Sequence, residues 1–137
     1  MKNSGHVLMS FAFLALTSSM FAHINVININ SVAEHKKCIS GKKPVITMYT
    51  ATWCGPCKTT KPHFATLADK YKNVTFCMVD IDKFSATLSA DMKIRGIPTF
   101  IVSFEGKAIK RETGGKNLKE LEKLIIDALE ETKKIIK

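Results

Sequence analysis

The sequence predicts an α/β fold with a central mixed β-sheet and helices on both faces. Short apolar runs typical of strands alternate with segments of helical spacing along most of the chain, which is the order found in α/β proteins. The last two strand-like runs face each other across a short turn and indicate an antiparallel hairpin. With 137 residues the chain has room for one core but not for two, so a single domain is expected.

The first half of the chain contains a strand over 23–29, a helix over 31–40, a strand over 45–50 and a helix that ends near residue 71. Gly41 is a suitable stop for the first helix, because glycine adopts the left-handed backbone with which many helices end. The largely apolar run from Val45 to Tyr49 indicates a buried strand. Pro62 lies inside the second helix and is expected to kink it.

The second half contains a strand over 74–80, a helix that ends near residue 92, strands over 99–104 and 108–112, and a long C-terminal helix. Asp82 or Ser85 is expected to open the helix that follows the first of these strands. Glu105-Gly106-Lys107 forms the turn of the predicted hairpin. The C-terminal helix is amphipathic, with apolar residues at helical spacing: Leu118, Leu121, Leu124, Ile125, Leu129 and Ile136.

The five residues Trp53-Cys54-Gly55-Pro56-Cys57 connect the buried strand to the kinked helix. Two cysteines separated by two residues at the start of one helix lie close enough to form and break a disulfide. The unpaired backbone N–H groups and the positive end of the helix dipole stabilise a thiolate on the first cysteine. The motif therefore predicts a redox-active pair of thiols.

Zinc binding is the competing interpretation of two cysteines at this spacing. A zinc site of this kind needs a second pair of cysteine or histidine ligands at short spacing. Cys38 and Cys77 are single, and the nearest histidine, His63, directly follows the proline of the helix. We therefore expect no metal.

Residues 1–22 have the composition of a secretory signal peptide. The first five residues contain one lysine and no acid, an apolar run follows over 7–16, and small residues lead to Ala22. We expect cleavage after Ala22, with cleavage after Ser19 as the alternative, and a mature domain over 23–137. The apolar run is short for a membrane span, although the segment is also consistent with an uncleaved anchor or with the leader of a cytoplasmic protein.

The net charge of the chain is +9. Such an excess can indicate binding to nucleic acid or to an anionic membrane. Here the lysines are scattered and do not alternate with aromatic residues, so we expect no nucleic-acid partner, and membrane contact only through an uncleaved N-terminal segment.

The cysteine motif over 53–57, together with a second motif over 96–99, resembles the thioredoxin family. The family has a proline in its active-site helix, matched by Pro62, and a cis-proline that faces the cysteines, matched in Gly96-Ile97-Pro98-Thr99. It also has a glycine in the last hairpin and another just after the last strand, matched by Gly106 and Gly114. The resemblance extends over nearly everything after the N-terminal segment and implies the thioredoxin fold. In that fold Lys58, Lys61 and Arg95 would lie near the cysteines, either to stabilise a thiolate or as solvated charges.

The resemblance implies a thiol–disulfide oxidoreductase. Cys54, partly exposed at the helix N-terminus, would attack a substrate disulfide, and Cys57 would resolve the mixed disulfide. In the family, Gly-Pro between the cysteines accompanies reducing enzymes, so reduction of protein disulfides is the expected direction. A disulfide oxidase or isomerase, and a non-catalytic binding module, are the alternatives. No cofactor is expected, because the dithiol is itself the redox group.

The expected partners are disulfide-containing proteins in the periplasm or outside the cell, and an electron donor that the sequence does not name. The chain is expected to act as a monomer. Trp53 and Pro98 would flank the sulfurs, with Gly55 and Pro56 supporting them. The backbone of Ile97 would pair with an extended substrate, and Gly114 belongs to the same expected binding surface.

One position departs from the family pattern beneath the second cysteine. The family usually buries an aspartate five residues before the motif tryptophan, and often has a lysine or glutamate near it on the neighbouring strand. Met48 and Met78 occupy these positions here. An apolar pair avoids the cost of a lone buried charge, but it removes a proton acceptor and predicts slower resolution by Cys57. Simple core filling is the other interpretation. Thr50 also stands where the family commonly has an aromatic residue.

Cys38 and Cys77 lie outside the motif. In the implied fold Cys77 points to the opposite face of the sheet from Met78, and the first helix packs on that face, so the two sulfurs can approach. A structural disulfide in an exported protein and two buried free thiols are both consistent with the sequence.

Overall fold

The computed structural model describes residues 25–84 and 86–137. The predicted leader over 1–22 and the first two residues of the predicted domain lie outside the described residues. In chain order the described elements are β1 (Val26–Asn28), α1 (Val32–Ile39), β2 (Val45–Thr50), α2 (Gly55–Lys70), β3 (Thr75–Asp80), α3 (Ala86–Asp91), β4 (Thr99–Phe104), β5 (Lys107–Thr113) and α4 (Leu118–Ile136).

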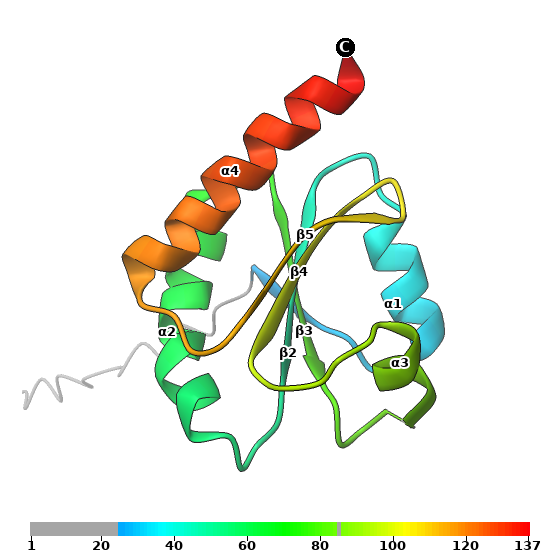
Figure 1. Ribbon diagram of the computed structural model, residues 1–137, viewed down its shortest axis with the longest axis vertical. Helices are drawn as coiled ribbons and strands as arrows, with labels where there is room; N and C mark the ends of the chain where they lie inside the picture. The colour runs from blue at the N-terminus through cyan, green and yellow to red at the C-terminus, as the bar shows by residue number, and fades with distance from the viewer. Residues whose placement is uncertain (1–24, 85) are drawn as a thin grey trace, which may run out of the picture.

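The described strands form one five-stranded sheet in the order β1-β3-β2-β4-β5. β1 and β2 both run parallel to β3, whereas β4 is antiparallel to β2 and to β5. Helices α2 and α4 cover one face of the sheet, and α1 and α3 cover the other (Figure 1). The predicted mixed sheet with helices on both faces is therefore confirmed.

Each face of the sheet has its own apolar core. On the α2 and α4 side, Phe64 packs edge-on against Phe76 with 5.1 Å between ring centroids, and Phe100 lies on its other side. On the α1 and α3 side, the buried cluster includes Tyr49 and Ile101. Because all six residues of β2 are buried, this strand separates the two cores.

Helix α1 is held on the sheet by a buried hydrogen bond and by a disulfide. His35 is 1% exposed, and its Nε2 lies 2.8 Å from the Tyr49 hydroxyl in a buried hydrogen bond. Burial lowers the pKa of His35 and raises that of Tyr49. Cys38, three residues further along the helix, is joined to Cys77 of β3 by a disulfide. Of the two states that the sequence allowed for this pair, the structure contains the bridge.

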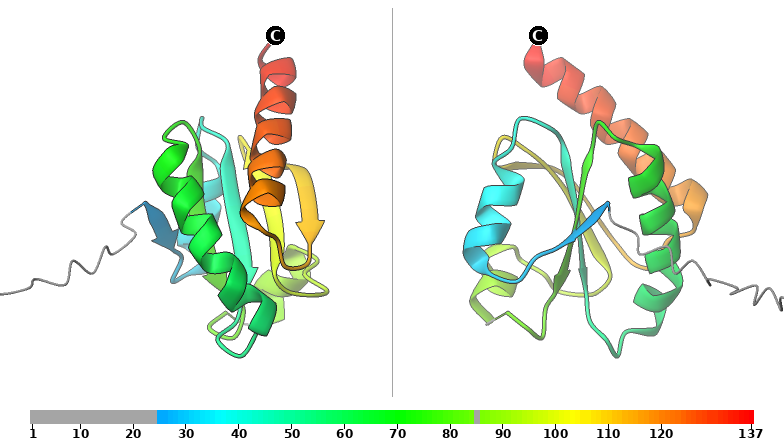
Figure 2. Two further views of the ribbon diagram at one scale, coloured as in Figure 1. Left: turned by 90° about the vertical axis from the view of Figure 1, so that its left-hand side faces the viewer. Right: turned by 180° about the vertical axis from the view of Figure 1, so that it is seen from behind.

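Helix α4 begins with a capping box, in which Asn117 and Glu120 each accept a hydrogen bond from the other's backbone N–H. The helix crosses α2, and its Glu122 accepts hydrogen bonds from Lys70 and Tyr71, which lower the pKa of the Glu122 carboxyl. Its C-terminal turns project beyond the sheet (Figure 2). Within the described residues, no helix has the length and apolar character needed to cross a membrane.

Several element boundaries differ from the predicted ones. The first strand covers only Val26–Asn28, although Ile29 still donates its N–H to Met78 of β3. The hairpin turn consists of Glu105 and Gly106 alone, because both adopt positive φ and bring Lys107 directly opposite Phe104. β5 therefore starts one residue earlier than predicted.

The short helix α3 also differs from its prediction. It covers Ala86–Asp91. Asp82, one of its two predicted starts, lies in the turn after β3, and Ser85 lies outside the described residues. Pro62 lies inside α2 as predicted, and the kink stays a prediction.

Candidate active site

The first cysteine of the motif is the N-cap of α2. β2 ends at Thr50, and Cys54 has an extended backbone, with φ −78° and ψ 108°, directly before the first helical residue. Pro56 in the first turn suits this start, because proline has no N–H that the helix would have to satisfy. The helix N-terminus, with its unpaired N–H groups, is therefore placed directly at Cys54.

Cys54 and Cys57 are joined by a disulfide, and their Cα atoms lie 5.3 Å apart. The backbone N–H of Cys57 also donates a hydrogen bond to the Cys54 Sγ, with 3.3 Å between nitrogen and sulfur. Cys57 is fully buried and Cys54 is only 4% exposed. The expectation of a partly exposed Cys54 is wrong for this oxidised state, because its sulfur is turned back onto the first turn of α2.

The predicted cis-proline is present, since the Ile97–Pro98 peptide bond is cis. The Pro98 carbonyl accepts a hydrogen bond of 2.8 Å from the N–H of Gly114, which has a φ of +105° that suits glycine. Two of the predicted site residues, far apart in sequence, are thus held together. Pro98 is buried, whereas Ile97 and Gly114 are half-buried.

Trp53 is 66% exposed, and its indole N–H donates a hydrogen bond of 2.8 Å to a carboxylate oxygen of Asp82. Its side chain borders a surface groove of about 370 Å³ that Arg95 and Ile97 also line. The predicted substrate-binding residues Trp53 and Ile97 therefore share one groove. From the sequence, Asp82 was expected only as a possible helix start. Its hydrogen bond with Trp53 was not predicted, because the two residues are 29 positions apart in the chain.

Sequence reasoning also missed the contact between the loop after β5 and the first turn of α2. The Thr60 hydroxyl donates to the Pro56 carbonyl at 2.9 Å and accepts from the Lys116 N–H at 3.0 Å. A Cβ on Gly115 would lie 3.1 Å from the Pro56 Cβ, so only glycine fits there without displacement. The two consecutive glycines, Gly114 and Gly115, are the sequence signal that could have indicated this close approach.

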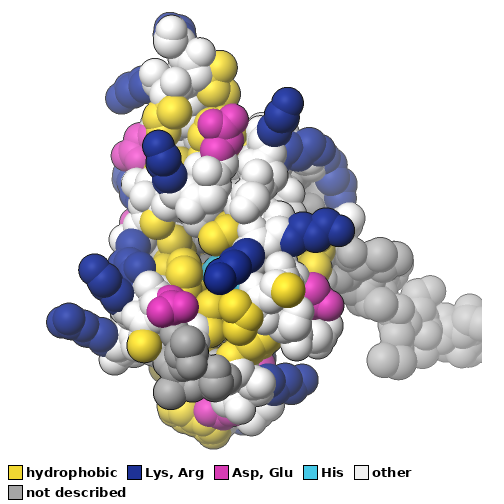
Figure 3. Space-filling view, turned by 90° about the vertical axis from the view of Figure 1, so that its right-hand side faces the viewer, with side chains coloured by type: hydrophobic (Ala, Val, Ile, Leu, Met, Phe, Trp, Pro, Cys, Tyr) yellow, Lys and Arg dark blue, Asp and Glu magenta, His cyan; other side chains and the backbone are white. Residues whose placement is uncertain are grey.

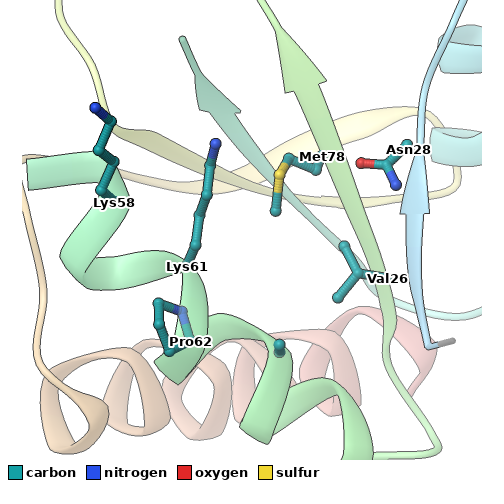
Figure 4. Close-up of a pocket in the computed structure, with 7 residues that line it drawn as sticks. Val26, Asn28, Lys58, Lys61, Pro62 and Met78 are labelled. Atoms are coloured by element: carbon teal, nitrogen blue, oxygen red, sulfur yellow. The ribbon is translucent and has the colours of Figure 1, made fainter. Parts of the chain in front are cut away.

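Beneath the motif, Met48 of β2 and Met78 of β3 are register partners. Met48 is fully buried in the same apolar cluster as Cys57, and Met78 packs against that cluster. Met78 also lines a groove of about 360 Å³ beside α2, with Lys58 and Lys61 on the opposite wall (Figure 4). None of the seven described residues that line this groove carries a carboxylate.

The described cysteines are all in disulfides, and no group of three or more histidine, cysteine, aspartate or glutamate side chains in the described part of the chain could hold a metal. The redox-active groups of the site are the sulfurs of Cys54 and Cys57. A disulfide that caps a helix, beside an exposed tryptophan and a cis-proline loop, can take up two electrons and two protons as it becomes a dithiol. Fold and site together define the class of thiol–disulfide oxidoreductases.

The chain belongs to the thioredoxin family, whose family model, thioredoxin, matches residues 25–127. It is 36% identical over 104 residues to thioredoxin Asp f 28 of Aspergillus fumigatus, covering 76% of this chain and 94% of that protein. Thioredoxin of Rattus norvegicus is also 36% identical over 104 residues, which cover 76% of this chain and 97% of that protein. The crystal structure of thioredoxin from Trypanosoma brucei brucei is similar with a TM-score of 0.72 at 26% identity, covering 81% and 96% of the two chains.

These relatives and the cysteine pair establish the activity class. The protein is a thiol–disulfide oxidoreductase that acts on disulfide-containing protein substrates. The predicted fold and the predicted enzyme class are confirmed, and the alternative of a non-catalytic binding module is wrong.

Proposed function

We propose that the protein reduces disulfides of exported proteins, with Cys54 as the attacking thiol and Cys57 as the resolving thiol. The observation that carries this assignment is the position of the two residues on α2: Cys54 caps the helix, whereas Cys57 lies one turn inside it and is fully buried. Of the two thiols, Cys54 lies at the end of the helix, where opening of the disulfide would present it to a substrate, whereas Cys57 stays inside the first turn.

The capping position also stabilises the attacking thiolate. The Cys57 N–H that points at the Cys54 Sγ can donate to the negatively charged sulfur once the disulfide is reduced. The dipole of the 16-residue helix adds to this stabilisation, and no acidic residue in its first turn opposes it. The thiolate is the reactive form of cysteine, so both effects favour attack at neutral pH.

The cycle has two exchange steps. The Cys54 thiolate attacks one sulfur of the substrate disulfide, the S–S bond breaks, and the other substrate sulfur leaves as a thiolate that takes up a proton. Cys57, after losing its proton, attacks the Cys54 Sγ and releases the second substrate sulfur as a thiol. Two electrons pass to the substrate, and the Cys54–Cys57 disulfide remains until an electron donor reduces it.

The groove between Trp53 and Ile97 is the proposed docking surface for the substrate. Trp53 offers an exposed aromatic face whose orientation is set by the hydrogen bond to Asp82. An extended substrate segment would pair with the backbone of Ile97, next to the buried Pro98. Gly114 donates its N–H to the Pro98 carbonyl, and we propose that it extends the same surface toward β5.

The location that we propose is outside the cytoplasm. The order of charged, apolar and small residues over 1–22 supports export through a secretory signal. The Cys38–Cys77 bridge is also typical of proteins from oxidising compartments.

Insulin reduction driven by dithiothreitol tests the assignment of the cysteines. Cys54→Ser should reduce the rate to the uncatalysed background, because the first exchange step is lost. Cys57→Ser should instead accumulate a mixed disulfide at Cys54, visible as a mass increase under non-reducing conditions. Alkylation provides the decisive check: if Cys57 of the reduced protein reacts faster than Cys54 at neutral pH, the two roles are reversed.

The direction of the reaction needs a separate measurement. Gly55 and Pro56 between the cysteines support a reductase, and a disulfide oxidase or isomerase is the alternative. A reductase requires a Cys54–Cys57 reduction potential close to that of a reducing thioredoxin, about −270 mV, whereas a strongly oxidising disulfide enzyme has a potential of about −120 mV. Equilibration with glutathione buffers gives this potential, and a value at the oxidising end would contradict the proposed direction.

A further inference from the structure

The second disulfide lies on the opposite side of the sheet from the active site. Cys77 belongs to the apolar cluster under α1 and α3, whereas Cys54 and Cys57 belong to the cluster under α2 and α4. The two disulfides are therefore separated by the sheet, and neither can reach the other within one molecule. Whatever chemistry Cys38 and Cys77 perform needs a partner that approaches from the α1 side.

This side of the molecule is open beside Cys38. A groove of about 340 Å³ between α1 and the β1 edge of the sheet is lined by Ile27, Ile29, Glu34, Lys37, Cys38 and Thr75. Cys38 is half-buried, while Cys77 is fully buried. Hydrophobic side chains are visible between basic side chains on this face (Figure 3). The groove therefore leads to Cys38 and not to Cys77.

A buried hydroxyl next to Cys77 lacks a partner in the disulfide state. In the described part of the chain, Thr47 and Thr50 have the only buried side-chain oxygen or nitrogen atoms without a hydrogen bond. Thr47 is the register partner of Cys77 in the parallel pair of β2 and β3, so both side chains point to the same face of the sheet. A disulfide sulfur has no proton to donate. Once the bridge is reduced, we expect the freed Cys77 thiol to turn toward the unpartnered Thr47 Oγ1 on the same face and donate to it.

We propose that Cys38 and Cys77 are a second redox-active pair, which exchanges electrons with low-molecular-weight thiols through the groove beside Cys38. A small thiolate attacks the Cys38 sulfur, the S–S bond breaks, and its electron pair leaves on the Cys77 sulfur, which takes up a proton. A second small thiolate then attacks the small-molecule sulfur of the mixed disulfide and releases Cys38 as a thiol. Two small thiols become one small disulfide, and the protein disulfide becomes a dithiol.

Titration with glutathione tests this proposal in the full chain carrying Cys54→Ser and Cys57→Ser, in which only the second pair can react. The protein is equilibrated at increasing ratios of reduced to oxidised glutathione, alkylated, and weighed by mass spectrometry. We expect two alkyl groups to be added while circular dichroism still reports the native fold. Reduction only under denaturing conditions would mean a purely structural bridge, and two free thiols without any reductant would mean no bridge; either result overturns the proposal.

The entry point is tested by trapping the mixed disulfide. In the same background, Cys77→Ser leaves Cys38 free, and Cys38→Ser leaves Cys77 free. With oxidised glutathione, the first variant should gain one glutathione at least about ten times faster than the second, because Cys77 is fully buried. Equal rates would contradict access through the groove.

The role of Thr47 is tested with a control from the same strand. Thr47→Val removes the acceptor beside Cys77 and should require an about five-fold higher ratio of reduced to oxidised glutathione for half-reduction, as expected for one lost hydrogen bond. Thr50→Val removes the other unpartnered hydroxyl, which belongs to the register partner of Asp80, and should leave the midpoint unchanged. Equal shifts in the two variants would contradict the proposed hydrogen bond.

Discussion

At the scale of single residues, the surroundings of Cys57 contain methionine where a proton acceptor would assist resolution. Met48 is fully buried in the same cluster as Cys57, and its register partner is Met78. Because neither thioether can take a proton, Cys57 must lose its proton to water or to a leaving thiolate. We therefore expect resolution of the mixed disulfide to limit turnover.

Met48→Asp should speed that step, because a carboxylate beneath Cys57 can accept its proton. The variant should also be less stable by on the order of several kcal/mol, since Met78 offers no partner to the new charge. Desolvation should raise the pKa of the introduced acid above its unfolded value of about 3.9. The penalty should therefore grow as the pH rises above that value and level off above the folded pKa.

Denaturant midpoints and insulin reduction rates between pH 5 and 9 measure both effects. Met48→Leu is the matched control, which keeps the core apolar and should change neither the rate nor its pH dependence. Adding Met78→Lys to Met48→Asp should recover part of the lost stability. If Met48→Asp and wild type reduce insulin at equal rates, resolution does not need a buried base.

At the scale of elements, α1 is held on the sheet by the buried pair of His35 and Tyr49. Burial lowers the pKa of His35 in the folded protein, so the unfolded chain binds the proton more tightly. The free energy of unfolding should therefore fall as the pH drops below the unfolded value of about 6.5, and the loss should end at the lower folded pKa.

His35→Gln should remove most of this dependence, because glutamine does not titrate. Urea unfolding at several values between pH 5 and 7.5 gives the slopes to compare. His63→Gln, on α2, is the control for the loss of a histidine outside this pair. An unchanged slope in His35→Gln would show that another group causes the acid sensitivity.

The loop after β5 is coupled to α2 through the close approach of Gly115 to Pro56. Gly115→Ala should cost about 1 kcal/mol of stability, because the added methyl group forces the loop or the proline ring to move. Gly41→Ala, where the new Cβ would make an ordinary contact of 3.5 Å, should have no comparable cost. The difference between their urea midpoints measures the effect; equal midpoints would show that the loop adjusts freely.

The sequence predicted those elements whose cause is local. β2 follows from a buried apolar run, the start of α2 from the cysteine motif, and the start of α1 from Ser31, whose hydroxyl accepts from the Glu34 N–H. Contacts between distant segments were not predictable in this way. The Trp53–Asp82 hydrogen bond and the Thr60–Lys116 contact depend on how the elements pack, and the burial of Cys54 depends on its bond to Cys57.

At the scale of the whole molecule, the N-terminal segment decides where the chain is located. Residues 1–22 should direct the chain out of the cytoplasm and be removed. Expression of the full chain in a bacterial host, followed by fractionation and N-terminal sequencing, should yield a mature protein that begins between residues 20 and 23. A chain with an intact Met1 in the cytosolic fraction would contradict export, whereas one that stays with the membrane would indicate the uncleaved anchor.

The order of the sheet leaves β1 and β5 at its two edges. Exposed edge strands can pair with the edges of other molecules and start aggregation. β1 has only three residues, and β5 carries three basic residues, Lys107, Lys110 and Arg111, against one acid, Glu112. A short edge offers few hydrogen bonds to a second sheet, and a basic edge repels an identical one. The molecule should therefore remain dispersed at high concentration, even while its disulfides are being opened and closed.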